Sequence, residues 1–235
     1  MPSHPIRQLF HIDHSITRHF QFDYLILDAV FLAVYVLILA RQRRYAALRA
    51  GIICGLLFYL IDGVIWYQTG VREYALPAPW VKHPTDFMMD ISYGIVGFGW
   101  VWIAFERRSR RDVAFWTVLL FSGWIAIPVL SKLIPLMDQP IMTVRHMQSQ
   151  VWIQIVVVLA GYVMLIVLGY PWRTIGYVLW VGCMLSFMME SALLVSGVRP
   201  PSIKVLIYET VILTNQGIPY LYVIRDKILP ALRRR

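Results

Sequence analysis

Seven apolar segments, each about 20 residues long, recur along the chain and constrain its fold more than any other feature. They cover residues 23–41, 46–68, 85–105, 113–135, 149–170, 174–195 and 203–223. Strands of a membrane β-barrel would instead alternate polar and apolar residues over about 10 positions. Charged residues make up only 15% of the chain and hydrophobic residues 59%, which excludes an ordinary soluble domain. We therefore predict an all-α integral membrane protein with seven transmembrane helices.

The basic residues between these segments predict the orientation of the chain. Arg173, the tracts RQRRYAALR and ERRSRRD, and the C-terminal RDKILPALRRR together contain 14 of the 22 Lys and Arg residues. Lys and Arg concentrate in cytoplasmic loops, so we expect an outside N-terminus and a cytosolic C-terminus in a cytoplasmic (inner) membrane. These runs explain the net charge of +9, and no nucleic-acid partner is expected.

The two halves of the chain share a repeated pattern. The segment CGLLFYLIDGVIWYQTGVRE and the later segment CMLSFMMESALLVSGVRP each contain a cysteine, an acid and a Gly-Val-Arg end, and TDFMMDISYGI similarly matches YETVILTNQGI. This pattern predicts two parallel three-helix repeats joined by a linker helix. The expected parts are a polar N-terminal tail (1–22), a first repeat (23–105), the linker helix (113–135), a second repeat (149–223) and a basic cytosolic tail (224–235).

Six acidic side chains fall within the apolar segments. They are Asp28, Asp62, Asp86, Asp90, Glu190 and Glu209. With a rise of about 1.5 Å per residue and the predicted orientation, all six lie in the outer half of the membrane. A charge in hydrocarbon costs about 3 kcal/mol or more, so such groups normally face the bundle interior and mark a functional path. Asp28 and Asp90, near helix starts, could instead reach water or cap the backbone.

Aromatic and amide side chains accompany these acids. Rings near helix ends often form an interfacial belt, but beside neutral acids they can also stabilise a cation by about 0.5 to 2 kcal/mol each. Buried amides either link helices or bind a ligand. The predicted substrate-binding residues are Tyr59, Trp66, Asp90, Tyr93, Trp100, Tyr208, Asn215 and Gln216.

Neutral acids and aromatic faces in an apolar bundle suit the protonation of an isoprenoid alkene or epoxide and the guidance of the resulting carbocation. The tracts YLIDGVIWY and IYETVILTNQG resemble integral-membrane terpene cyclases of meroterpenoid pathways, and the three-helix duplication is similar to the related membrane lycopene cyclases. The resemblance implies a catalytic pair at Asp62 and Glu209, with Glu190 as a further candidate. Asp and Glu are exchanged relative to that pair, and HPTDFMMD keeps the proline and one acid, Asp86, of a lycopene-cyclase signature.

We therefore predict a membrane-embedded terpene cyclase in which Asp62 or Glu209 donates the proton. Glu190 and Asp86 would tune that donor or accept the final proton, and the catalytic candidates are thus Asp62, Glu209, Glu190 and Asp86. The expected partners are a lipophilic isoprenoid or prenylated substrate and the lipid bilayer. This scheme requires no organic cofactor and no metal.

Other classes of function fit part of this pattern. Two parallel three-helix repeats around a linker are also the plan of small sugar transporters, in which the carboxyls could couple transport to protons. A structural scaffold with its acids tied in pairs also stays open. A seven-helix photoreceptor is disfavoured, because it needs a lysine deep in the last helix and Lys204 lies at the outer edge of that helix.

Overall fold

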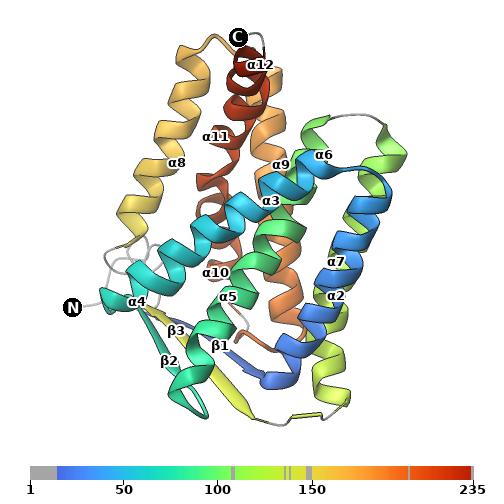
Figure 1. Cartoon of the computed structure of the whole chain (residues 1–235). Helices are drawn as coiled ribbons and strands as arrows, with labels where there is room; N and C mark the ends of the chain where they lie inside the picture. The colour runs from blue at the N-terminus through green and yellow to red at the C-terminus, as the bar shows by residue number, and fades with distance from the viewer. Residues whose placement is uncertain are drawn as a thin grey trace, which may run out of the picture. The chain divides into compact units, whose positions relative to one another are not determined.

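The computed structural model describes residues 15–106, 109–134, 136–137, 139–146, 150–200 and 202–233. Within these residues, five helices are long and apolar enough to cross a membrane (Figure 1), and they identify a helical integral membrane protein. Three are the uninterrupted helices α2 (Phe22–Arg41), α7 (Arg110–Leu133) and α9 (Trp172–Val195). The other two are composite: α3 (Tyr45–Phe58), η1 (Tyr59–Ile65) and α4 (Trp66–Gln68) form one, and η2 (Pro79–Val81), α5 (Lys82–Ser92), η3 (Tyr93–Phe98) and α6 (Gly99–Glu106) form the other.

The last two predicted segments are also helical, but one is shorter and the other is interrupted. The first is α8 (Gln150–Val167), and the second comprises α10 (Ile203–Val211), η4 (Leu213–Gln216), α11 (Ile218–Val223), η5 (Ile224–Ile228) and α12 (Leu229–Arg233). Pro219 lacks the backbone N–H that a continuous helix would use. The Asn215 side chain replaces missing donors, since its Nδ2 lies 3.3 Å from the Thr210 carbonyl and 3.0 Å from the Val211 carbonyl. The predicted segment 203–223 is therefore helical, but it is interrupted between Val211 and Ile218.

Contacts between residues divide the chain into two compact units. Unit 1 comprises Met1–Asp13, Met147–Ser191 and Ser202–Arg235, and unit 2 comprises His14–His146 and Ala192–Pro201. The boundary near residue 147 lies close to the predicted start of the second repeat at residue 149. The repeat relation itself stays a prediction.

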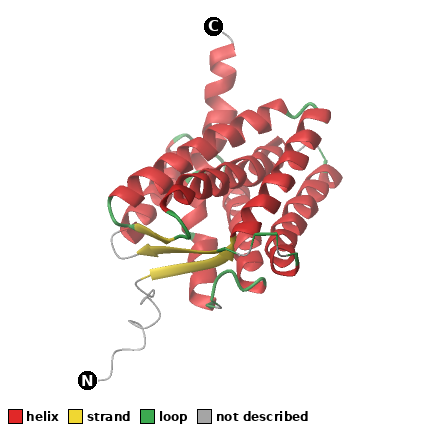
Figure 2. Cartoon of the chain, turned by 60° about the horizontal axis from the view of Figure 1, so that its bottom comes forward, coloured by secondary structure: helices red, strands yellow, loops and turns green. Residues whose placement is uncertain are grey.

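Unit 2 contains a three-stranded antiparallel sheet that the sequence did not predict (Figure 2). Its strands are β1 (Ser15–Gln21), β2 (Arg72–Ala75) and β3 (Pro140–His146), in the order β1-β3-β2. The register pairs Ser15 with His146 at one end of β1 and Arg72 with Arg145 at one end of β2. Each strand adjoins a helix end, because β1 leads into α2 and β2 follows α4 after three residues. The predicted tail 1–22 is thus a strand over its last residues, and residues 1–14 lie outside the described part.

Glycines allow two composite helices of unit 2 to approach each other closely. A Cβ atom added to Gly94 of η3 would lie 2.3 Å from the Cα and N atoms of Gly55 on α3. The two backbones are therefore in direct contact, as small residues permit in membrane helix pairs. This contact holds η1, which carries Asp62, beside α5, which carries Asp86 and Asp90.

Candidate functional site

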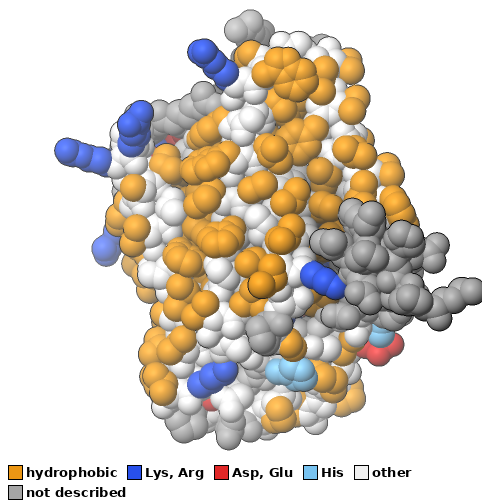
Figure 3. All heavy atoms as spheres, turned by 180° about the vertical axis from the view of Figure 1, so that it is seen from behind, with side chains coloured by type: hydrophobic (Ala, Val, Ile, Leu, Met, Phe, Trp, Pro, Cys, Tyr) orange, Lys and Arg blue, Asp and Glu red, His pale blue; other side chains and the backbone are white. Residues whose placement is uncertain are grey.

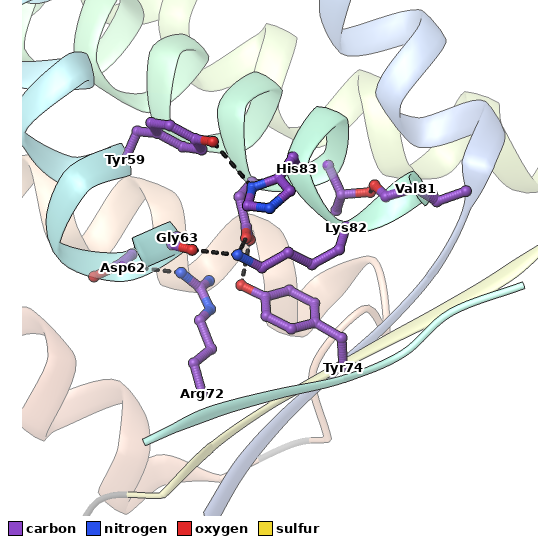
Figure 4. A network of polar contacts seen from close by, with 10 residues as sticks. Tyr59, Asp62, Gly63, Arg72, Tyr74, Val81, Lys82 and His83 are labelled. Atoms are coloured by element: carbon purple, nitrogen blue, oxygen red, sulfur yellow. Dashed lines mark hydrogen bonds and ion pairs between the residues drawn. The ribbon is translucent and has the colours of Figure 1, made fainter. Parts of the chain in front are cut away.

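Three of the predicted acids meet in one polar cluster of unit 2. Asp62 lies in η1, a π-helical segment of the kind often found at functional sites, and Asp86 and Asp90 lie one turn apart on α5. Asp90 interacts electrostatically with both of the other acids. Tyr59 and His83 border the cluster on its exposed side, with 3.1 Å between Oη and Nδ1 (Figure 4).

Asp62 is paired with an arginine from the sheet. Nη1 of Arg72, on β2, lies 2.8 Å from Oδ2 of Asp62, and the two side chains are 6% and 17% exposed. Burial would lower the pKa of Arg72, but neighbouring carboxylates, with Asp62 first, raise this pKa well above its usual value. Arg72 therefore stays charged and stabilises the carboxylate form of Asp62. This pairing suits an electrostatic role for Asp62 better than the predicted role of proton donor.

Asp86 has donors on both sides. Tyr74, also on β2, donates from its hydroxyl to Oδ1, and Nζ of Lys82 lies 3.4 Å from Oδ2 without hydrogen-bond geometry. Lys82 donates instead to the Gly63 carbonyl and lies 4.0 Å from the centre of the Tyr67 ring (Figure 4). Burial, more than any other cause, raises the pKa of Tyr74, so its hydroxyl stays a donor. Tyr74 and Lys82 thus stabilise the carboxylate of Asp86, whereas its burial opposes ionisation.

Asp90 differs from both of these acids. It is 6% exposed, and its Oδ2, like Oδ2 of Asp86, has no hydrogen-bond partner among the described residues, so the difference lies in its contacts with cations. Arg72 acts on it electrostatically, and Arg18 of β1 does so more weakly. Within the described part of the chain, Asp90 makes no ion pair of the kind that joins Asp62 to Arg72. It is therefore the acid of the cluster with the least support for a negative charge.

A group of aromatic rings begins one turn beyond Asp90. Tyr93, three residues later, lies 5.3 Å from Phe58 and 5.7 Å from Phe98 between ring centres, and stacks on Trp124 at 6.2 Å. Phe58 and Phe98 are 5.1 Å apart. We call these four rings the aromatic cluster. Their faces can stabilise a cation close to the acid on α5.

The other predicted rings of unit 2 have separate contacts. Trp66 lies beneath the guanidinium of Arg145, 6.0 Å from the ring centre. Trp100 is completely buried, and its indole N–H donates to Oγ1 of Thr117 at 2.9 Å. The structure therefore places Tyr93 beside the acid, but gives Trp66 and Trp100 contacts outside the aromatic cluster.

The predicted acids of unit 1 are completely or almost completely buried, with Glu190 on α9 0% exposed and Glu209 on α10 1% exposed. Tyr208, next to Glu209, donates from its hydroxyl to Oε1 of Gln154 at 3.2 Å. Because these residues belong to another unit, the predicted pairing of Asp62 with Glu209 in one site stays a prediction.

The two predicted amides lie at the interruption of the last helix. Asn215 is completely buried, and its Oδ1 accepts a hydrogen bond from the Tyr162 hydroxyl at 2.9 Å. Asn215 also donates to two carbonyls at the end of α10, so it links α10 to α8, which carries Tyr162. Gln216 is half-buried in η4.

The side chains that contact the acids were not among the predicted site residues. Lys82 was detectable, because it precedes Asp86 by four residues on one helix, and Arg72 was a possible partner as a cation near the predicted outer boundary. Tyr74 carried no such signal, since it reaches the cluster only through the sheet. Comparisons with models of protein families, with curated proteins and with solved structures found no match to this chain.

Proposed function

We propose that this protein is a membrane-embedded enzyme that uses Asp90 as a Brønsted acid to start the cyclisation of a lipophilic isoprenoid. One observation carries the proposal: a buried carboxyl with an oxygen lacking a described partner lies one helical turn from the aromatic cluster. An acid initiates such a reaction only when it is protonated, positioned and shielded from water. Asp90 replaces Asp62 as the donor because Asp62 is held by Arg72.

The charges of the cluster support a proton on Asp90. Two buried cations, Arg72 and Lys82, lie among three carboxyls, and each cation contacts a carboxyl other than that of Asp90. A buried site resists net charge, so a third carboxylate is unfavourable there. Asp90 as the neutral member leaves the two buried cations opposite two carboxylates, and the half-buried Arg18 acts on Asp90 more weakly than Arg72 does.

The proposed reaction is an isomerisation without redox chemistry. The Asp90 hydroxyl protonates an alkene carbon or an epoxide oxygen, and the C=C π bond or the C–O bond supplies the electron pair. The resulting carbocation is attacked by further double bonds of the substrate, which form the rings, while the aromatic cluster stabilises the positive charge. Loss of a C–H proton to a carboxylate, either Asp90 or Asp86, restores a double bond and ends the reaction.

We also propose that the chain crosses the membrane seven times, as its sequence predicts. Helix α8 and the composite segment from α10 to α12 would add two passes to the five long apolar helices. With the N-terminus outside, the acid cluster would lie near the outer boundary of the membrane, and a prenyl substrate would enter from the bilayer. The proposed enzyme would carry two parallel three-helix repeats.

The test is incubation of the detergent-purified protein in heavy water with plain and epoxidised prenyl-arenes and polyprenyl chains, read by mass spectrometry. We expect a cyclised isomer, with one deuteron incorporated from a plain alkene. Asp90→Asn should abolish turnover. Asp28→Asn is the matched control, because Asp28 is another buried acid of unit 2 but accepts a hydrogen bond from Ser92 at 2.7 Å. Equal activity in both variants would remove Asp90 from the mechanism.

A transporter is the second candidate, because the last helix is interrupted at Asn215 and Pro219. Interrupted helices at membrane depth form substrate and ion sites in many transporters. The transporter would be favoured over the enzyme by two results together. Every substrate of the panel would stay intact, and liposomes that contain the protein would take up a solute.

A further inference from the structure

Exposed arginines gather at the end of unit 2 opposite the sheet. Helix α2 starts at the sheet and ends at Arg41, and the turn that follows joins it to α3; α6 ends and α7 begins at the same end of the unit. We call the exposed arginines in and beside these two connections the arginine surface, and its members are Arg41, Arg43, Arg49, Arg110 and Arg111.

The local acids are already engaged by a different arginine. Arg44, which is 6% exposed, donates from Nη1 to Glu106 and from Nη2 to Asp112. Residues 41–49, 106 and 109–112 contain two acidic residues, Glu106 and Asp112, and Arg44 contacts both. Arg44 thus ties the two connections together and neutralises part of their negative charge. Six arginines against two carboxylates still leave residues 41–49, 106 and 109–112 with a net charge of +4, so the arginine surface stays strongly positive.

The backbone at Arg43 is strained. Its φ is 55°, in the left-handed region, and its N–H bonds to the Ala40 carbonyl as the chain leaves α2. Glycine is the usual residue at this position after a helix, because a Cβ atom disfavours the left-handed conformation. The chain therefore places a cationic side chain where glycine would give a more stable turn.

Apolar side chains next to the arginine surface face outward. Tyr45 and Ile53 of α3 are 51% and 66% exposed, and Phe115 and Val118 of α7 are 47% and 67% exposed. Figure 3 shows a face that is covered mainly by apolar side chains, with several basic side chains projecting at its upper edge and others lower on the face. In a bilayer, this edge would lie at the level of the lipid phosphates while the apolar side chains contact the acyl chains.

We propose that the arginine surface binds the phosphate groups of anionic phospholipids. Juxtamembrane arginines attract anionic lipid, with about a fivefold gain in affinity for each arginine that engages. Guanidinium forks match phosphate oxygens in pairs. The strained arginine at position 43 and the excess of arginines over acids in the described connections both fit this role. The proposal is independent of the enzymatic function proposed above.

The test is lipid selectivity of the full chain in phosphatidylcholine vesicles that contain increasing fractions of phosphatidylglycerol. Association of labelled phosphatidylglycerol with the wild type should exceed that of labelled phosphatidylcholine several-fold. The triple variant Arg41→Gln/Arg110→Gln/Arg111→Gln should lose most of this preference. Arg173→Gln, which removes an isolated exposed arginine at the start of α9, is the control and should keep it. Equal preference in the triple variant and the control would overturn the proposal.

Arg43→Gly separates lipid binding from fold stability. In phosphatidylcholine alone this variant should unfold at a higher temperature than the wild type, because glycine relieves the left-handed strain, yet its preference for phosphatidylglycerol should fall. An unchanged preference would contradict the role of Arg43. Inorganic phosphate, tested in detergent, should not stabilise the wild type. If it does so as strongly as phosphatidylglycerol, the surface binds free anions and the lipid assignment is wrong.

Discussion

Replacement of Gly94 by alanine tests whether backbone contact sets the position of the acid cluster. The added Cβ would lie 2.3 Å from two backbone atoms of Gly55 and 2.6 Å from the carbonyl oxygen of Gly51. Carbon atoms pack at about 3.5 to 4.0 Å, so α3 and η3 must separate by more than about 1 Å. No side-chain rotation relieves this clash, because the atoms that it meets are backbone. The separation would also move Asp62 away from Asp90.

The magnitude follows from the cost of overpacking. An extra methyl group in a filled core destabilises by about 1 to 3 kcal/mol, and occasionally more. For a chain of this size, each kcal/mol corresponds to about 2 to 4 °C, so Gly94→Ala should lower the unfolding temperature by about 2 to 12 °C. Gly99→Ala is the matched control in the same composite helix, since its Cβ would lie 3.7 Å from the nearest atom, the Ala47 carbonyl oxygen.

The assay is thermal unfolding of the detergent-purified variants, followed by far-ultraviolet circular dichroism. Gly99→Ala should leave the unfolding temperature unchanged or raise it slightly, because alanine favours a helix over glycine by about 0.5 to 1 kcal/mol. If Gly94→Ala and Gly99→Ala unfold at the same temperature, the close approach of α3 and η3 is wrong.

Three further predictions concern stability. Arg44→Met should destabilise by about 3 kcal/mol in the same unfolding assay, because Glu106 and Asp112 lose their common cation; a change below about 0.5 kcal/mol would contradict this. Burial raises the pKa of Tyr74, so the stability that its neutral form contributes is complete below pH about 10 and is lost as the pH rises further. Between pH 10 and 11, chemical unfolding should show the wild type losing up to about 1.4 kcal/mol more than Tyr74→Phe, whereas parallel curves would refute this. Asn215→Ala should destabilise by about 2 to 3 kcal/mol because it removes donors from two buried carbonyls, and thermal unfolding at the wild-type temperature would contradict that link.

The helical part of the fold was predictable because hydrocarbon allows few alternatives. A membrane-spanning segment must satisfy its own backbone hydrogen bonds, so a long apolar run becomes a helix whatever its partners are. The predicted segment 23–41 therefore agrees with α2 to within one residue. The interruption after Val211 was not predicted, because Pro219 alone does not show whether a helix bends or breaks. The buried contacts of Asn215 decide that outcome.

The sheet could not be predicted from local patterns. Its three strands come from segments separated by at least 50 residues, and each is short and partly polar. Arg72 and Tyr74 consequently looked like loop residues, although they meet Asp62 and Asp86 through β2. The spacing of Asp86 and Asp90 did predict that the two acids lie one turn apart.

Infrared spectroscopy of the carboxyl groups tests the central claim most directly, because it reports whether Asp90 carries a proton before any substrate binds. The protein in lipid at neutral pH should show the C=O stretching band of a protonated carboxylic acid that shifts in heavy water. The Asp90 component of this band should disappear in Asp90→Asn and persist in Asp62→Asn, because Asp62 is paired with Arg72; other buried acids, such as Asp28 and Glu190, can supply the remainder of the band. A band that survives unchanged in Asp90→Asn would contradict the account, since the proposed acid would then be ionised and unable to start the reaction.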